Sequence, residues 1–383
     1  MKPGHYDYII AGAGCAGRSL AIRLLREPAL ADKKILLVDN TRKVSNDRTW
    51  CFWEKNADIF EDIVSCRWST LSFSDADRNH LLNIHPYQYK LIRSIDFYHY
   101  TSKIITESNI DVIHGNVENM YNGNEYATAV IDGAKITAGY IFSSIPYELT
   151  TVSSDYTYLL QHFKGWVIET DVAFFDPGKA TLMDFYPGDK AMTAFFYTLP
   201  YSDKKALIEY TIFSDSILLH EQYEQALSDY IENRLGCKAY KITEVEDGCI
   251  PMFDQQFRKA DDRIIYLGIA GGNAKASSGY TFRYIQKHSA VIVQLLASGK
   301  YPAAINKYPR RFRFYDSIFL RLLSGNKISG MDIFSRLFTK NRPEQILKFL
   351  DNETSFGEEV LIFSTLQKKV FASEAFRTMI SWL

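Results

Sequence analysis

The sequence predicts an α/β protein: a Rossmann-like nucleotide-binding fold with an inserted antiparallel β-sheet and a helical C-terminal region. Three observations support this fold class. Glycine-rich turns follow short apolar strands near residues 12 and 268. Four aromatic-rich segments between residues 165 and 213 alternate in the manner of β-strands. Beyond Pro302 the apolar residues recur at helical spacing.

Length and composition restrict the class of protein. The chain has 383 residues, enough for two or three domain-sized cores, and a formal net charge of −1, which argues against a general nucleic-acid binder. Its five cysteines are scattered without the spacing of a metal site, so we expect no metal. The first strand begins near residue 6, which leaves no room for a signal peptide, and no apolar run approaches the ~18 residues of a membrane span. We therefore expect a cytoplasmic globular protein.

The first glycine-rich turn lies between a buried strand and a helix, which is the setting of a dinucleotide-binding motif. A strand over Tyr6–Ala11 leads into Gly12, Gly14 and Gly17, the G-x-G-x-x-G spacing. The first glycine permits the tight turn, the second lets a pyrophosphate approach the backbone, and the third lets the helix pack on the strand. Asp39 ends the next strand, where an acid suits the hydroxyls of an adenosine ribose. The alternative is a βαβ unit that binds nothing.

A second glycine-rich turn, far downstream, favours FAD over NAD as the dinucleotide. It follows a strand over Arg263–Leu267 and precedes a helix whose N-terminus would stabilise negative charge on a flavin. Gly268-Ile269-Ala270 stands where many flavin hydroxylases carry Gly-Asp-Ala, which argues against a routine hydroxylase. The alternative is a turn that needs glycine only for packing. The glycines predicted to contact the cofactor in this segment are Gly268, Gly271, Gly272 and Gly279.

We therefore predict a flavin-hydroxylase-like architecture in four parts. Residues 1–150 and 246–300 form the two parts of the FAD-binding domain. Residues 151–245 form an antiparallel-sheet substrate domain, and residues 301–383 form a helical region. No repeat or low-complexity linker separates these parts, so we expect the domains to be interleaved.

Two acidic residues fall inside predicted strands of the substrate domain. In ALIEYTIF (residues 206–213), Glu209 shares one strand face with Leu207 and Thr211, so it stands among apolar neighbours. Carboxylates are rarely buried without a partner, so a buried one is a candidate catalytic acid. Asp184 in LMDFY has the same character, with weaker support. The alternative is a glutamate on an edge strand that faces water.

The C-terminal region is basic and rich in aromatic residues. Residues 300–344 contain ten Lys and Arg against three Asp and Glu, a net charge of +7. The apolar residues lie among arginines at helical spacing. This pattern predicts either a surface that binds an anionic membrane or ordinary solvated core helices. The apolar residues concerned are Phe312, Tyr315, Phe319, Leu322, Leu323, Phe334, Leu337 and Phe338.

Several segments, in order along most of the chain, resemble the bacterial lycopene cyclases. FKGWVIETD (residues 163–171) resembles a Gly-Trp-x-x-Glu signature of that family, and ALIEYT resembles the Phe-Leu-Glu-Glu-Thr motif that carries its essential glutamate. IIAGAGCAG, NDRTWCFWE, GIAGGNAKASSGYTF and KFLDNETSFGEEVLIF are similar to further segments of the family. The departures are Asp47-Arg48 in place of a His, Tyr210 in place of the second acid, and Ser278 in place of a Thr.

The resemblance implies a redox-neutral reaction on lycopene or a related acyclic carotenoid. A proton adds to a terminal double bond, the tertiary carbocation closes into a β-ionone ring, and another proton leaves. The resemblance assigns the acid to Glu209, which an apolar pocket would keep protonated, and Asp184 is the second candidate. It also implies reduced FAD, with NAD(P)H as the reductant, and peripheral contact with a membrane surface. Whether the flavin or Glu209 delivers the proton stays open.

Two other functions are compatible with these motifs. A flavin oxidoreductase acting on a prenyl lipid, either a reductase or a monooxygenase, would share every glycine motif but would change the mass of its substrate. A non-catalytic flavin-containing lipid carrier would use the same pocket but would have no reason to bury Glu209.

Overall fold

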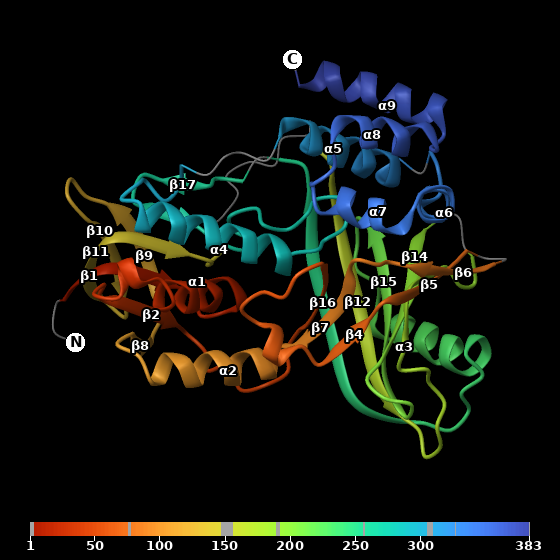
Figure 1. Cartoon of the computed structure of the whole chain (residues 1–383), viewed down its shortest axis with the longest axis horizontal. Helices are drawn as coiled ribbons and strands as arrows, with labels where there is room; N and C mark the ends of the chain where they lie inside the picture. The colour runs from red at the N-terminus through yellow and green to blue at the C-terminus, as the bar shows by residue number, and fades with distance from the viewer. Residues whose placement is uncertain are drawn as a thin grey trace.

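The structure is a computed structural model that describes residues 4–75, 78–146, 156–188, 192–255, 257–304, 309–325 and 327–382. Figure 1 shows a sheet with flanking helices at one end of the long axis, an antiparallel sheet at the other end, and a group of C-terminal helices above that second sheet. The predicted α/β class, with an antiparallel sheet and C-terminal helices, is confirmed.

The first sheet carries both glycine-rich turns. Its path runs β17-β18-β11-β1-β2-β8, and β10 and β9 continue from β11. β1 pairs in parallel with β2 and with β11, and β11 pairs in parallel with β18, so the strands that precede the two turns are separated by a single strand. Its strands are β1 (His5–Ala11), β2 (Ile35–Asp39), β8 (Asp111–His114), β9 (Val117–Asn122), β10 (Ala127–Ile131), β11 (Ala134–Ser143), β17 (Ala260–Asp261) and β18 (Ile264–Tyr266).

Three helices cover one face of this sheet. They bury apolar side chains such as Leu20, Phe97 and Ile292 against Ile10 of β1. The β9–β10 hairpin covers the other face, where Ala129 packs with Ile9 and Leu36. The three helices are α1 (Cys15–Leu25), α2 (Ser94–Thr106) and α4 (Phe282–Ala297).

The second sheet has seven strands in the order β16-β12-β15-β14-β13-β5-β6 and is antiparallel except for the pair β13–β5. The four strands predicted from the middle of the chain are present as β12 to β15. Strands β5, β6 and β16 come from outside that stretch, and the predicted domain boundaries stay a prediction. The strands are β5 (Thr70–Ser74), β6 (Asn79–Asn83), β12 (Tyr158–Glu169), β13 (Lys179–Asp184), β14 (Thr193–Pro200), β15 (Lys205–Ser214) and β16 (Lys241–Phe253).

The two faces of the second sheet are covered by different parts of the chain. Helix α3 (His220–Asp229) packs on one face, together with a π-helical turn over Tyr230–Arg234. The C-terminal helices pack on the other face, where Phe334 meets Phe195 and Phe213. These helices are α5 (Arg310–Ser324), α6 (Gly330–Lys340), α7 (Pro343–Leu350), α8 (Phe356–Ser364) and α9 (Lys368–Ser381).

A third, three-stranded sheet joins these parts. Its order is β3-β7-β4, with β3 over Thr49–Glu54, β7 over Gln88–Arg93 and β4 over Cys66–Trp68. Trp53 of this sheet donates a hydrogen bond to the carbonyl of Leu347 in α7 at 3.1 Å. The small sheet therefore links the N-terminal half of the chain to the C-terminal helices.

Two glycines of the first turn differ in the space around them. A Cβ at Gly17 would lie 2.0 Å from the carbonyl oxygen of Gly12, whereas a Cβ at Gly14 would meet no atom within 4 Å. Gly17→Ala is therefore expected to lower the free energy of unfolding by roughly 1–3 kcal/mol, the usual cost of overpacking. Gly14→Ala is expected to change it by no more than about 0.5 kcal/mol. Urea unfolding of both variants measures the difference, and equal stabilities would contradict the packing role of Gly17.

Candidate active site

One cavity, of about 580 Å³, connects the glycine-rich turns to the second sheet. Its walls include Gly14, Gly268 and Gly279 from the two predicted cofactor segments, and Glu209 from β15. The structure therefore brings the predicted acid and the predicted cofactor turns to a single site. The predicted residues that do not line this cavity are Gly12, Gly17, Asp39, Asp184, Gly271 and Gly272.

The two glycine-rich turns pack directly against each other. Gly268 has a φ of 57°, in the left-handed region that favours glycine, and a Cβ there would lie 3.1 Å from the Cβ of Ala16. Ala16 belongs to the first turn of α1 and lies inside the first glycine motif, directly before Gly17. Each turn therefore fixes the position of the other at this end of the cavity.

Asp39 holds the first turn in place. Its carboxylate accepts hydrogen bonds from the backbone N–H groups of Ala13, at 2.6 Å, and Thr41, at 2.8 Å. Burial opposes ionisation, but hydrogen bonding and the nearby Lys43 ammonium outweigh it and hold the pKa of Asp39 below its usual value. The carboxylate is therefore charged and positioned by the protein, and its contact with a ribose stays a prediction.

Several features of the cavity fit a dinucleotide. Helix α1 begins at Cys15 with no side chain capping it, and the open space beside Gly14 lets an anion reach its backbone N–H groups. The side-chain oxygen of Gln161 and the hydroxyl of Ser278 belong to lining residues, are buried, and have no hydrogen-bond partner among the described residues. Buried polar atoms without hydrogen-bond partners are rare, so a polar ligand is expected to form hydrogen bonds with these two atoms.

At the sheet end of the cavity, two glutamates meet over a glycine. Strand β12 runs between β15 and β16, and its Gly165 pairs with Glu209 in β15 and with Glu246 in β16. Directly paired residues of antiparallel strands point to the same face of the sheet, so both glutamates lie on the face of Gly165. Their carboxyl groups are hydrogen-bonded to each other.

This environment favours a protonated Glu209. Burial, together with the neighbouring Glu246 carboxylate, raises the pKa of Glu209 to about 8, and the hydrogen bond that Thr211 donates at 2.8 Å only partly opposes this. Burial also raises the pKa of Glu246, which accepts a hydrogen bond from Thr49 at 2.6 Å. The pair therefore holds one proton at neutral pH, and that proton lies mainly on Glu209.

Aromatic rings surround the pair of glutamates. Tyr197 is the neighbour of Glu209 in β14, and the hydroxyls of Tyr89 and Tyr280 lie 3.3 Å apart in the same wall. Burial raises the pKa of all three tyrosines, so they are neutral at physiological pH. Neutral aromatic faces stabilise a cation without offering a strong nucleophile. The other aromatic lining residues are Trp50, Tyr98, Phe163, Phe257 and Phe282.

The structure does not bring Asp184, the second predicted acid, to this site. Asp184 pairs with Phe196, which pairs with Tyr210, so Asp184 shares the face of Tyr210, opposite that of Glu209. Its carboxylate accepts hydrogen bonds from Arg234, at 3.0 and 3.2 Å, and from Tyr230, at 3.1 Å. Asp184 is an ion-pair partner on the α3 side of the sheet, and the alternation that selected it did not distinguish the two faces.

Sequence analysis missed Gly165 and Glu246 as residues of the site. Gly165 belongs to the Gly-Trp-x-x-Glu segment, but the sequence indicates no function for it. Glu246 lies in the polar segment TEVED, where no feature of the sequence separates it from Glu244. Only the pairing of β12 with both of its neighbours identifies these two residues.

The predicted basic, aromatic C-terminal segment buries its apolar residues. Phe312, Leu322 and Phe334 are each no more than 3% exposed and belong to the protein core. The apolar residues that are exposed lie further on: Phe356 and Leu361 of α8 are 68% and 62% exposed. The exposed apolar residues of the C-terminal end are Phe356, Val360, Leu361, Phe376, Met379, Ile380 and Trp382.

Comparison with known proteins places the chain in a family. The family model described as lycopene cyclase protein matches residues 7–377, nearly the whole sequence. The chain belongs to the lycopene cyclase family. No curated protein sequence matches it. The resemblance found in the sequence motifs is therefore confirmed at the level of the family.

Solved structures of similar fold include a protein described as a flavoprotein/dehydrogenase and a protein solved in complex with FAD. A flavoprotein/dehydrogenase from Cytophaga hutchinsonii has a TM-score of 0.66 at 11% identity, with 99% of this chain and 100% of that chain covered. A geranylgeranyl bacteriochlorophyll reductase-like protein from Thermoplasma acidophilum has a TM-score of 0.63 at 12% identity, covering 97% and 98%. CtdE, solved in complex with FAD, has a TM-score of 0.58 at 13% identity, covering 97% and 98%. The TM-scores show that this chain shares the fold of these proteins.

In the part of the chain that the structure describes, no helix is long and apolar enough to cross a membrane. The same residues include no group of three or more His, Cys, Asp and Glu side chains arranged to hold a metal ion. Family and fold together support an enzyme with a flavin-related, carotenoid-type function.

Proposed function

We propose that this protein cyclises the linear ends of lycopene, or of a related acyclic carotenoid, to β-ionone rings in a redox-neutral reaction that requires reduced FAD. The observation that carries the proposal is a glutamate, Glu209, that lies beside Glu246 in the wall of an aromatic cavity that also reaches the glycine-rich turns. Protonating an alkene requires an acid held at one carbon and shielded from water. Glu209 is fixed on β15 in a largely aromatic cavity wall, which a bound hydrocarbon would close to water.

The proposed mechanism uses this chain's own residues for each proton transfer. Glu209 donates its proton to the terminal double bond, which leaves a tertiary carbocation on the substrate. The rings of Tyr197, Tyr280 and neighbouring aromatic residues stabilise that cation, each by roughly 0.5–2 kcal/mol. The next double bond attacks the cation and closes the ring. The carboxylate left at Glu209 takes up the second proton that leaves the ring, which gives the alkene. Substrate and product therefore have the same composition.

The cofactor site is assigned to the two glycine-rich turns. Gly14 and the N-terminus of α1 would contact the pyrophosphate, Asp39 the ribose, and Gly268 and Gly279 the flavin side of the molecule. Bound FAD in its reduced form would supply negative charge near the cationic carbon. NAD(P)H is proposed as the reductant that maintains this form.

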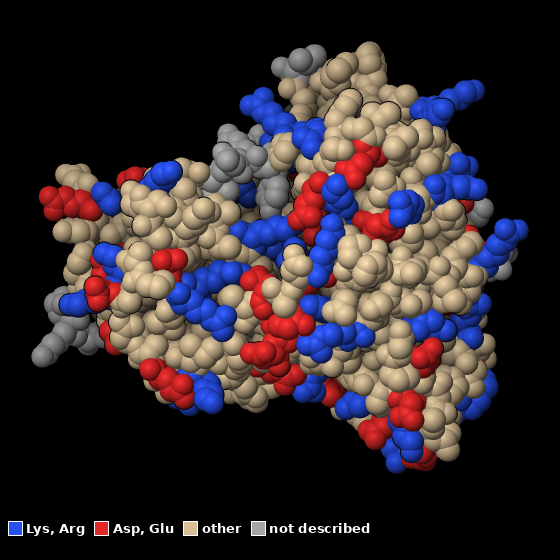
Figure 2. Space-filling view, in the orientation of Figure 1, with Lys and Arg blue, Asp and Glu red and all other residues tan. Residues whose placement is uncertain are grey.

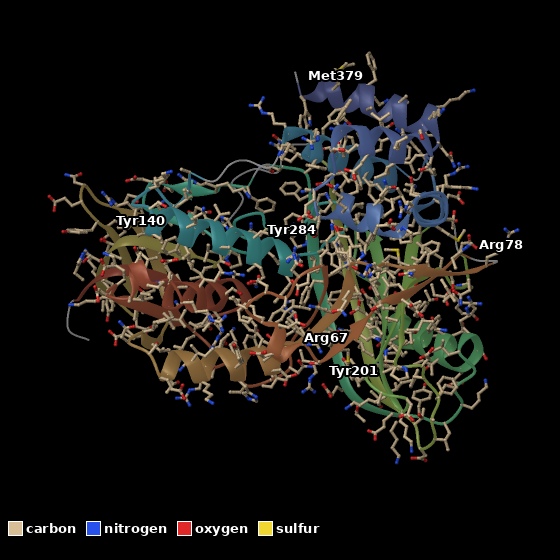
Figure 3. All side chains as sticks on the ribbon, viewed as in Figure 1. Arg67, Arg78, Tyr140, Tyr201, Tyr284 and Met379 are labelled. Carbon is tan, nitrogen blue, oxygen red and sulfur yellow. The ribbon has the colours of Figure 1, made fainter. Side chains whose placement is uncertain are left out.

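Membrane association is proposed through α8 and α9, because most apolar residues of the segment 300–344 are buried in the core. Phe376, Met379 and Ile380 are spaced along one side of α9 and are 61%, 49% and 56% exposed. Figure 3 shows Met379 at the outer edge of the molecule, and Figure 2 shows an area there without charged residues, with Lys and Arg at its flanks. We propose that this surface contacts an anionic bilayer.

The charges of these two helices suit an anionic partner. Lys368 and Lys369 of α9 are exposed, and Arg377, also exposed, pairs with Glu374. The acidic residues among the described side chains of α8 and α9 are each buried or paired: Glu359 with Arg311, Glu374 with Lys327, and Glu358 with Lys348. Cations therefore dominate the accessible charge of this surface.

An apolar route for the substrate lies beneath the same surface. A second cavity, of about 320 Å³, is lined by Phe363 of α8 and Phe371 of α9. Its wall also includes Ser277, the neighbour of Ser278 in the wall of the main cavity. We propose that a carotenoid leaves the bilayer along this cavity, because a long hydrocarbon has little solubility in water.

The reaction itself gives the first test of this proposal. Purified protein with reduced FAD is expected to convert lycopene to cyclic product in deuterated water, with one non-exchanging deuterium gained for each new ring and no other mass change. Mass spectrometry of the pigment and the consumption of NAD(P)H measure the outcome. Reductant consumed in proportion to product would instead favour a reductase acting on a prenyl lipid.

The acid is tested by Glu209→Gln, which keeps the size and the hydrogen-bonding capacity of the side chain. Ring formation is expected to fall by roughly 10²–10⁴, the usual contribution of a general acid, while flavin content and melting temperature stay close to wild type. Asp184→Asn is the control and is expected to lower stability, since it weakens the pair with Arg234, more than it lowers ring formation. Near wild-type cyclisation by Glu209→Gln with FAD bound would remove Glu209 as the acid.

The membrane surface is tested by flotation with liposomes. The protein is expected to float with anionic liposomes at low salt and to be released at high salt. Phe376→Asp is expected to reduce the bound fraction about tenfold or more, because it removes a large apolar side chain from the interface. Val172→Asp is the matched control, since Val172 is 71% exposed and far from α9 in the sequence. Binding that does not depend on lipid charge or salt, or equal binding by the two variants, would contradict the proposal that this surface contacts an anionic bilayer.

A further inference from the structure

The absence of a side chain at Gly165 creates the contact between Glu209 and Glu246. Adjacent strands lie about 4.8 Å apart, so residues on either side of a central strand are separated by about 9.6 Å of backbone. A side chain on the central residue normally fills that space. A Cβ at Gly165 would lie 3.5 Å from the Cβ of Glu209, 3.2 Å from the Cγ of Glu246, and 2.9 Å from the Cδ1 of Leu207.

The two glutamates have different partners, and this decides which of them holds the proton. Glu246 accepts a hydrogen bond from Thr49 at 2.6 Å and lies in the field of the Arg48 guanidinium, and both stabilise its charged form. Glu209 accepts one hydrogen bond, from Thr211 at 2.8 Å, and lines the cavity. The carboxylate is therefore Glu246, and the neutral acid that faces the cavity is Glu209.

The other titratable groups around the pair do not compete for this proton. Cys51 of β3, Tyr197 of β14 and Tyr280 before α4 face Glu209, and burial raises the pKa of each, so all three are neutral. The groups that face Glu246 are Arg48, Cys51, Tyr201 and Glu244, and of these Arg48 is the cation. One proton is thus shared by two carboxyl groups, with neutral side chains around Glu209 and with Arg48 and Glu244 beside Glu246.

We propose that Glu246 is a positioning residue that keeps Glu209 protonated and aimed into the cavity, and that Gly165 is the spacer that allows the two to touch. The proposal rests on the cyclisation proposed above. When Glu209 gives its proton to the substrate, the pair is left with two adjacent negative charges. That pair is a strong base, and it takes up the proton that leaves the ring, which restores the starting state.

The geometry also accounts for the altered second position of the glutamate motif. Tyr210 stands where the family motif has a second acid, and its ring stacks on Phe196 at 4.5 Å on the opposite face of the sheet. A carboxyl group at residue 210 would therefore point away from Glu209. In this chain the acid that reaches Glu209 comes from β16, two strands away, across Gly165.

The pH dependence of ring formation tests the proposal. Ring formation by wild type is expected to fall as the pH rises through about 8, because Glu209 loses its proton there. Glu246→Gln removes the neighbouring negative charge, which lowers the pKa of Glu209. The alkaline limb, the part of the pH–rate profile where ring formation declines as the pH rises, is therefore expected to shift to lower pH by at least about one pH unit. Asp247→Asn, an exposed neighbour in the same strand, is the control and should leave the limb in place. An unchanged limb in Glu246→Gln would overturn the proposal.

A spectroscopic measurement separates this proposal from the proposed function. The infrared C=O band of a protonated carboxyl group that is present in wild type at pH 7 and missing in Glu209→Gln reports the proton directly, without turnover. This band is expected to disappear at a lower pH in Glu246→Gln. If the band shifts in this way but wild type forms no ring, the proposed role of Glu246 is supported and the proposed cyclisation is contradicted. If wild type forms rings but the band does not shift, the role of Glu246 fails.

Gly165→Ala provides a second, independent change. The added methyl group occupies the space over which the carboxyl groups meet, so the same downward shift of the Glu209 band is expected in folded protein. Urea unfolding identifies any loss of stability from the contact with Leu207. A folded Gly165→Ala protein whose band titrates as in wild type would overturn the spacer role.

Discussion

The cost of removing a carboxyl group from water is the constraint on which the site depends. A charged Glu209 would be poorly solvated among aromatic rings, so the neutral form is favoured as long as water is kept out. The C-terminal helices, which cover this face of the second sheet, and the small sheet that carries Trp50 and Cys51 together exclude solvent. Enclosure thus keeps a proton on Glu209 at neutral pH, and the C-terminal region contributes to the site by covering this face of the sheet.

The position of Glu209 could be predicted from the sequence, whereas the position of Asp184 could not. Alternation within ALIEYTIF depends only on the two-residue period of a strand, so it correctly grouped Glu209 with Leu207 and Thr211. The same rule applies equally to LMDFY. Which face of a strand turns toward the cavity depends on how the whole sheet packs against the rest of the chain, and that information is not local. Asp184 therefore met the same criterion and lies on the wrong face.

Long-range pairing explains the other gaps in the prediction. The turn–helix motifs at Gly14 and Gly268 are local, and their roles in the fold followed from short segments. Glu246 reaches the site only because β16 pairs with β12 along its length. The register of this pairing cannot be predicted from the segment TEVED alone. Likewise, helical spacing identified an apolar stripe that includes Phe334, but a stripe has the same pattern whether it meets protein or lipid. Its burial is decided by the aromatic rings of the sheet it covers.

The three residues over the central strand also constrain how the sequence can change. The side chains of Glu209 and Glu246 share the space that a side chain at Gly165 would fill. The size and charge tolerated at each of the three positions therefore depend on the residues at the other two. A larger residue at 165 is tolerated only if a neighbouring side chain becomes shorter, and a shorter acid at 209 or 246 breaks the contact across the gap. Substitutions at these positions should therefore accumulate jointly during divergence, although the three residues lie far apart in the sequence. The glycine thus acts as a point of evolutionary coupling between two strands that never pair with each other.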